Sequence, residues 1–480
     1  MEINKAQHKM ILITVGIATF MSALDSSIVN VALPQIQTYF NKPMAIVEWI
    51  VLSYLLVISS LLLTYGKLGD MYGHKKMHLS GFAIFTVSSF ICGISPNILT
   101  LIVARGFQAI GAGMLMAMGP AIIIAVTNAK ERGKALGVNA VAISIALTSG
   151  PILGGILTSA LGWQSIFFMN VPIGIIGLIM CKKFVPNSSK KSNEKFDALG
   201  AVLVFLALMS LLVPLSLGNE VGWNSPIVIS LILISIVLFG MFIVVEKKSK
   251  HPMLMLSLFR NRQFTLSNIA LLVSFVAQFF INILMPFYFE QLRDMSPAST
   301  GLMLIPIPLA SLLVTPISGI LCDKIDAKKL CFMGMAISTL GIVLLSFLNI
   351  NSSIMQIVIC FSIIGVGFGL FQTPNTYTIM NSVPQKISGI ASSIQATMRN
   401  IGMVIGVAAV NSIFILEQSH ISAALKLQGL TGKTLNVQAF TGAFRFTYII
   451  ATVIAAISAI ISLVSTYGKE KGKEKIEKAA

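Results

Sequence analysis

Charged residues are scarce in this 480-residue sequence: Asp, Glu, Lys and Arg together make up 11% of it, whereas hydrophobic residues make up 55%. A soluble domain carries about 25% charged residues. The mean hydropathy is +0.87. A water-soluble fold cannot hide so much apolar surface in its interior. The composition therefore argues against a soluble protein and predicts a chain that lies in a lipid bilayer.

Motifs of enzyme chemistry are also missing. The sequence shows no His/Cys/carboxylate cluster with metal-ligand spacing at membrane depth, and no glycine loop followed by Lys-Ser or Lys-Thr for a nucleotide phosphate. We therefore predict no catalytic residues, no metal and no cofactor. Cysteines are few and fall in apolar runs or at predicted cytoplasmic ends, so no disulfide framework is expected. They are Cys92, Cys181, Cys322, Cys331 and Cys360.

Long apolar runs are what the sequence has in abundance. The first, residues 11–33, follows Lys5 and Lys9 as in a signal peptide, but it is long enough to span a bilayer and is predicted to be retained. Further runs of about 20 residues recur to the end of the chain. We predict fourteen spans, near residues 11–33, 46–65, 77–95, 98–127, 135–161, 166–181, 198–217, 227–245, 264–289, 298–321, 330–348, 353–381, 388–416 and 443–467.

Basic residues are distributed unevenly between the predicted loops. The sequence has 34 Lys and Arg against 17 Asp and Glu, a net charge of +17. Nearly all of the basic residues in the loops and tails fall on the side that holds both termini. The opposite side receives only Lys42, Arg293, Lys426 and Lys433. Cytoplasmic loops carry such an excess, so both termini are predicted to be cytoplasmic. The charge is explained by topology, and no nucleic-acid partner is expected.

The two halves of the sequence resemble each other. Gly66, Leu68, Asp70, Lys75 and Lys76 match residues 253 positions later, and Gly111, Gly113 and Pro120 match residues 254 positions later. Two six-helix bundles related in this way form a parallel repeat. We predict an N-terminal bundle over 1–184, two linker helices over 185–263, and a C-terminal bundle with a cytoplasmic tail over 264–480.

Several motifs in order resemble the fourteen-span drug:proton antiporter branch of the major facilitator superfamily, the EmrB/QacA type. The segments LDSSIVNVALP (24–34), GKLGDMYGHKK (66–76), RGFQAIG (105–111) and GPILGG (150–155) are similar to its motifs in the first span, the loop after the second, the fourth span and the fifth span. Ala109 departs from the glycine that is usual there, and the fifth-span motif lacks an obvious upstream glycine.

This resemblance implies an all-α membrane protein with the major facilitator fold, two six-helix bundles plus two extra helices. It also implies alternating access, with export of amphipathic or cationic drug-like compounds in exchange for protons across the plasma membrane. Small-molecule substrates, protons and the lipid bilayer are the expected partners, and the protein is expected to be a monomer. Transport of one metabolite, an amino acid or a lipid-like solute, stays open as an alternative. An intramembrane enzyme is a more distant one.

Asp25 and Arg105 are the leading site candidates, because charges inside a span are costly and therefore functional by default. Their positions along oppositely directed spans place both roughly 10 Å from the same membrane surface. Burial disfavours the charged form of Asp25 and a nearby Arg105 favours it, the balance that a proton carrier needs. A static structural ion pair is the alternative interpretation.

Other candidates are predicted for gating, for substrate binding and for helix packing. For gating we predict Gly66, Asp70, Lys75, Asp323 and Lys328, which lie at the cytoplasmic edges of both halves. Helix-end stabilisation is the alternative for these residues. Polar residues at membrane depth predict a substrate cavity lined by Asn30, Gln108, Gln278, Asn282, Gln372, Asn375 and Tyr377. Close helix packing is predicted at Gly150, Pro151, Gly154 and Gly155. Glu48 and Glu290 lie near outer span ends, where water is expected to reach them.

Overall fold

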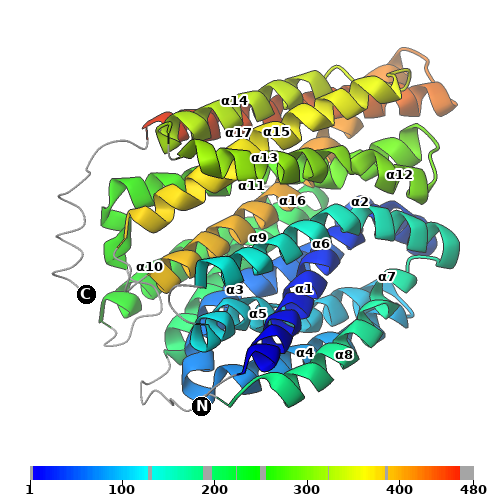
Figure 1. Ribbon diagram of the computed structural model, residues 1–480. Coiled ribbons are helices and arrows are strands. Elements are labelled where there is room, and N and C mark those ends of the chain that lie inside the picture. The colour runs from blue at the N-terminus through cyan, green and yellow to red at the C-terminus, as the bar shows by residue number, and fades with distance from the viewer. Residues whose placement is uncertain are drawn as a thin grey trace. The chain divides into compact units, whose positions relative to one another are not determined.

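The structure is a computed structural model, and it describes residues 4–127, 132–187, 197–222, 224–248, 256–322, 324–383 and 388–464. Within these ranges every regular element is a helix (Figure 1). This agrees with the predicted all-α class. In a bilayer the α-helix satisfies every backbone hydrogen bond within its own segment.

The helices up to the first long basic loop are α1 (Lys5–Phe40), α2 (Met44–Val47), α3 (Trp49–Tyr72), α4 (His74–Gly93), α5 (Ile98–Val126), α6 (Arg132–Leu161), α7 (Ser165–Phe168) and α8 (Asn170–Phe184). The next two are α9 (Ala198–Val221) and α10 (Pro226–Lys248). The remainder are η1 (Leu256–Arg260), α11 (Arg262–Phe287), η2 (Tyr288–Leu292), α12 (Pro297–Leu304), α13 (Pro306–Cys322), α14 (Ala327–Leu345), α15 (Ile354–Asn381), α16 (Ser388–Leu427) and α17 (Gly432–Val464).

Among the described residues, 11 helical segments are long and apolar enough to cross a membrane. The predicted number of fourteen spans is therefore not confirmed. The other three predicted spans fall on α4, α6 and α9. The helix α4 begins with His74, Lys75 and Lys76, which lower its hydropathy. In α6 and α9 the apolar stretches found are the shorter segments Ser149–Leu161 and Leu199–Leu211.

The contacts divide the chain into two compact units. One comprises Met1–Leu208, Leu238–Met253 and Ser296–Leu302, and the other comprises Met209–Val237, Leu254–Met295 and Met303–Ala480. Each unit takes part of α9 and part of α10, whereas the sequence predicts a separate linker segment over 185–263. The three-part division stays a prediction.

The same packing scheme occurs inside each unit. In the first, α1 packs on α6, α5 on α3 and α4, and α8 on α4 and α1. In the second, α11 packs on α16, α15 on α13 and α14, and α17 on α14 and α11. The two schemes are the same if each helix of the second unit is matched with one of the first. In chain order, the helices α11, α13, α14, α15, α16 and α17 correspond to α1, α3, α4, α5, α6 and α8. The internal repeat seen in the sequence is therefore a repeat of helix packing.

Glycine allows two helices to meet closely at equivalent points in both units. A Cβ on Gly111 of α5 would lie 2.7 Å from the carbonyl oxygen of Gly81 and 2.9 Å from Phe85 Cα, both in α4. A Cβ on Gly367 of α15 would lie 2.5 Å from the carbonyl oxygen of Gly334 and 2.8 Å from Ser338 Cα, in α14. Gly111 thus corresponds to Gly367, whereas the sequence offset pairs it with Gly365. The offset pairing is wrong because it aligned two glycines by their spacing in the sequence, whereas the equivalent helix contact is made by Gly367.

We expect Gly111→Ala to destabilise the first unit. Its methyl group would meet backbone atoms of α4, which move only if the helices separate, and such overpacking costs about 1–3 kcal/mol. Gly106→Ala, five residues earlier in α5 with nothing within 4 Å of its Cβ position, is the matched control, and its melting temperature should match or exceed that of wild type. Melting temperatures in detergent measure both. Equal melting of the two variants would contradict the close contact.

The predicted packing motif lies on α1. A Cβ on Gly150 would collide with the Ser27 hydroxyl, and one on Gly154 would lie 2.9 Å from the Ile28 carbonyl oxygen. Pro151 is also buried in α6, whereas Gly155 faces α12, where a Cβ would collide with the Pro297 carbonyl oxygen. The second unit repeats this contact, with Gly402 and Gly406 of α16 against α11. The close approach fixes the part of α1 that follows Asp25.

Candidate functional site

Asp25 and Arg105 form a buried ion pair in the first unit. The Arg105 Nη1 atom lies 2.5 Å from Asp25 Oδ2, and the two side chains are 1% and 0% exposed. Asp25 lies in the middle of α1, whose first turn is capped by Asn4. Arg105 lies two turns into α5, which begins at the Asn97 cap. The structure therefore brings together the two charges that the sequence places at one depth.

Two amides complete the shell of donors around the Asp25 carboxylate. Gln108 Nε2 and Asn170 Nδ2 donate to Asp25 Oδ1 at 3.1 and 3.0 Å. Gln108 also accepts from Arg105 Nη1 at 2.6 Å and donates to Ser89 Oγ at 2.7 Å. Asp25 thus accepts hydrogen bonds from three side chains on α5 and α8.

Arg105 is held from further sides. Its Nε atom donates to the Ile50 carbonyl oxygen at 3.1 Å, at the start of α3. The guanidinium carbon lies 4.0 Å from the centre of the Tyr54 ring and 5.7 Å from that of Phe167. A desolvated cation over an aromatic face gains about 2 kcal/mol. Side chains or backbone of α1, α3, α4, α5 and α8 therefore meet in one polar network, which we call the Asp25 network.

The Asp25 network is neutral overall and its charges are mutually satisfied. A buried pair of this kind is not a strong source of stability, because desolvation of the two ions offsets their attraction. The arrangement is sensitive to any event that removes one partner, since the other charge is then left uncompensated. A proton on Asp25, or a cation in place of Arg105, is such an event. The geometry also fits a static pair, which the sequence left open.

Sequence reasoning missed Ser89, Asn170 and Tyr54. Each is a polar or aromatic side chain within an apolar run, and a helix-by-helix comparison of depth would have singled out Asn170, near the start of its span. Gln108 was predicted as a cavity residue, and it lies on the same face of α5 as Arg105, three residues later. What the sequence could not give is that all of these side chains converge on one carboxylate.

The remaining cavity candidates lie apart from the Asp25 network in several environments. Asn30 is buried in α1, and its Oδ1 accepts no hydrogen bond within the described part of the chain. Asn375 is likewise buried, and its Nδ2 has no acceptor there. Gln278 is buried in α11, Tyr377 is 50% exposed, and Asn282 and Gln372 are half-buried. The last five belong to the second unit.

The gating candidates fall largely outside what is described. Asp323 is not among the described residues, and Gly66 and Asp70 lie in α3 with surroundings that are not described. Lys75 is half-buried in α4. Lys328 Nζ lies 3.6 Å from Asp326 Oδ2, and the Asp326 carboxylate also accepts from the Lys328 backbone N–H. Asp326 thus caps α14. The gating role stays a prediction.

The expectation that water reaches Glu48 is wrong. Glu48 lies at the junction of α2 and α3, and its exposure is 0%. Glu290 is half-buried in η2. The burial depends on how the helices pack around this junction, which a span boundary drawn from hydropathy cannot show.

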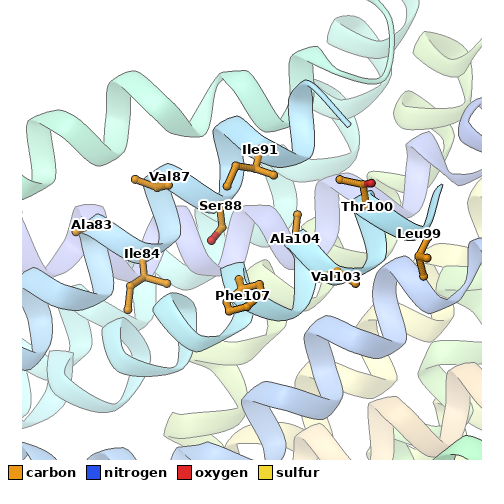
Figure 2. Close-up of a pocket in the computed structure, with 10 residues that line it drawn as sticks. All are labelled: Ala83, Ile84, Val87, Ser88, Ile91, Leu99, Thr100, Val103, Ala104 and Phe107. Atoms are coloured by element: carbon orange, nitrogen blue, oxygen red, sulfur yellow. The ribbon is translucent and has the colours of Figure 1, made fainter. Parts of the chain in front are cut away.

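Two surface grooves flank α5, and neither contains the Asp25 network. The larger, of about 740 Å³, lies between α4 and α5 (Figure 2). The second, of about 510 Å³, lies between α3, α5 and α9. Val103 and Phe107 line both, and Val103, Phe107 and Leu99 are more than half exposed. Such exposed apolar side chains are expected where a helix faces lipid tails, so we interpret both grooves as membrane-facing surface.

No disulfide joins the five cysteines, all of which lie in described helices. Within the described ranges no group of three His, Cys, Asp or Glu side chains is arranged to hold a metal ion.

The sequence is similar to those of known membrane transporters. The sequence model described as Major Facilitator Superfamily matches residues 15–407. The chain is 37% identical over 409 residues to the riboflavin transporter RibZ of Clostridioides difficile, covering 85% of this chain and 88% of the relative. It is 34% identical over 403 residues to the multidrug resistance protein Stp of Mycobacterium tuberculosis, covering 84% and 75%. It is 30% identical over 410 residues to the multidrug transporter protein MdtP of Bacillus subtilis, covering 85% and 76%.

The protein belongs to the major facilitator superfamily. It is a multi-pass membrane transporter of a small molecule and not an enzyme. The family fits the repeated packing of the two units, because parallel repeats of this kind are a property of the superfamily.

Proposed function

We propose that this protein is a proton-coupled antiporter that exports amphipathic or cationic compounds across the plasma membrane by alternating access. The proposed topology has fourteen spans, with α4, α6 and α9 crossing the membrane beside the 11 apolar segments, and with both termini cytoplasmic. Relatives that carry the names multidrug resistance protein and multidrug transporter support a drug-like substrate. The excess of basic residues in alternate loops supports the orientation.

The observation that carries the proposal is the buried Asp25 carboxylate with its partner Arg105. When the first unit opens to one side, water enters the Asp25 network and a proton competes with Arg105 for the carboxylate. A cationic substrate competes for the same negative charge. Proton and substrate then exclude each other from Asp25, and this exclusion produces exchange. Asn30 and Gln108 are proposed substrate-binding residues of the first unit, and Gln278, Asn282, Gln372, Asn375 and Tyr377 are proposed ones of the second.

A single-metabolite transporter is the second candidate, favoured by the relative named a riboflavin transporter. Riboflavin is neutral, so its transport would not need a carboxylate to compete with a proton. The Asp25–Arg105 pair would then be structural. The two candidates differ in breadth of substrate and in coupling to protons.

We expect lipophilic cations to release a proton gradient through this protein. Inside-out vesicles are energised to an acid interior, and a fluorescent dye follows the gradient while ethidium or tetraphenylphosphonium is added. Both cations should dissipate the gradient in vesicles that contain the protein and not in vesicles without it. Uptake of labelled riboflavin, with no response to either cation in fully energised vesicles, would instead establish the second candidate.

A further inference from the structure

Glu48 is a second buried carboxyl in the first unit, and its surroundings are the opposite of those of Asp25. Both side chains are 0% exposed. Asp25 accepts from three side chains, whereas neither carboxyl oxygen of Glu48 has a hydrogen-bond partner in the described chain. Glu48 also makes no side-chain cap at the start of α3. The polar end of this side chain is therefore buried without compensation.

The charged form of such a group is strongly disfavoured. A buried ion without a partner costs several kcal/mol even after relaxation, and a carboxyl group avoids this cost by taking a proton. Among the described residues, neither Glu48 carboxyl oxygen has a donor that would hold it as an anion. On α1, α3, α4 and α5, the helices that pack around this junction, the charged residues toward the Glu48 end are Asp25 and Arg105, which pair with each other. Lys42, in the preceding loop, is exposed.

Glu48 is also connected to the Asp25 network through α3. The Ile50 carbonyl oxygen that accepts from Arg105 Nε lies two residues after Glu48, about 3 Å along the helix axis. Glu48 itself is helical, with φ −58° and ψ −27°, and its backbone N–H donates to the Met44 carbonyl oxygen at 3.0 Å, so α2 leads directly into α3. A movement of this junction that exposes Glu48 to water also shifts the Ile50 carbonyl. Exposure of Glu48 and release of Arg105 are thus mechanically coupled.

We propose that Glu48 is a second proton-binding carboxyl of the transport cycle, protonated in the conformation seen here and deprotonated when the α2–α3 junction opens to water. On opening, the carboxylic acid transfers its proton to a water molecule and remains as a carboxylate. Arg105, released from Ile50, is then the nearest cation that can stabilise it. This inference rests on the proposed proton coupling and adds a second carrier to Asp25.

An infrared measurement tests the protonation independently of transport. In purified wild-type protein at neutral pH we expect a carbonyl stretching band of a protonated carboxylic acid that exchanges slowly in heavy water, because the group is buried. The band should be absent from Glu48→Gln and present in Asp25→Asn and in Glu417→Gln, whose carboxyl is half-buried in α16. A spectrum in which Glu48→Gln retains every protonated-carboxyl band overturns the inference.

A transport measurement tests the role in the cycle. Glu48→Gln keeps the size and neutrality of the protonated side chain, so the variant should fold and bind ethidium like wild type. The number of protons moved per ethidium ion should fall by about one. An unchanged ratio would overturn the carrier role even if the infrared band is found. If wild-type vesicles exchange no protons at all, the proposed function fails, while the infrared result still decides whether Glu48 is protonated.

Discussion

Asp25→Asn is expected to reach the membrane and to lose proton-coupled transport completely. Asparagine has the shape of aspartate and can still accept from Gln108 and Asn170, but it binds no proton in the physiological range and offers no negative charge to a cation. Addition of ethidium to energised vesicles should then dissipate the gradient no faster than in vesicles without the protein. The measurement is the initial rate of the dye signal, normalised to the amount of protein.

The control for this variant is Asp294→Asn. Asp294 is an exposed acid whose Oδ2 lies 3.2 Å from Lys433 Nζ, and exposed pairs of this kind contribute about 0–1 kcal/mol. Its transport should equal that of wild type. Full cation-driven proton exchange by Asp25→Asn would refute the role of this carboxylate and leave the ion pair as a structural feature of the first unit.

Arg105→Gln is expected to cause a large loss of stability. It leaves the Asp25 carboxylate buried without a counter-ion, and breaking one side of a buried pair costs about 3–5 kcal/mol. The double variant Asp25→Asn/Arg105→Gln removes both charges and should recover most of this loss, because neutral amides satisfy each other at the same positions. Proton exchange should remain absent from the double variant.

Thermal melting in one detergent measures this cycle, with Arg445→Gln as the surface control. Arg445 is exposed in α17, so its substitution should change the free energy of unfolding by less than about 0.5 kcal/mol. Additive losses in the double variant would show that Asp25 and Arg105 do not interact energetically. Recovered stability together with lost exchange would separate the structural role of the pair from its role in coupling.

Much of the fold followed from hydropathy and spacing. The apolar runs predicted the helices, because only α-helices satisfy their backbone within a lipid environment when no barrel pattern is present. The count of spans was less secure. The helix α4 carries His74, Lys75 and Lys76 in its first turn, so length and hydropathy alone do not identify it as a span. Its position is fixed instead by packing on α5 and α8.

The two charged residues of the candidate site could be predicted from the sequence, but the side chains that surround them could not. Asp25 and Arg105 stand out because each is a rare charge within an apolar run. Ser89, Asn170 and Tyr54 carry no such signal, since single polar and aromatic side chains occur in most spans. For Glu48 the sequence prediction was wrong: its position near a span end predicted contact with water, whereas the folded protein buries it.

The sequence by itself determined the membrane class, the helical spans, the repeat and the two charges at one depth. These follow from local properties, namely the transfer free energy of side chains and the rise per residue of a helix. Only the tertiary structure decided which side chains surround each buried carboxyl. Within the described residues, Asp25 accepts from three side chains and Glu48 from none, because donors come from helices distant in sequence whose rotation is set by close packing, such as that of Gly111 on Gly81.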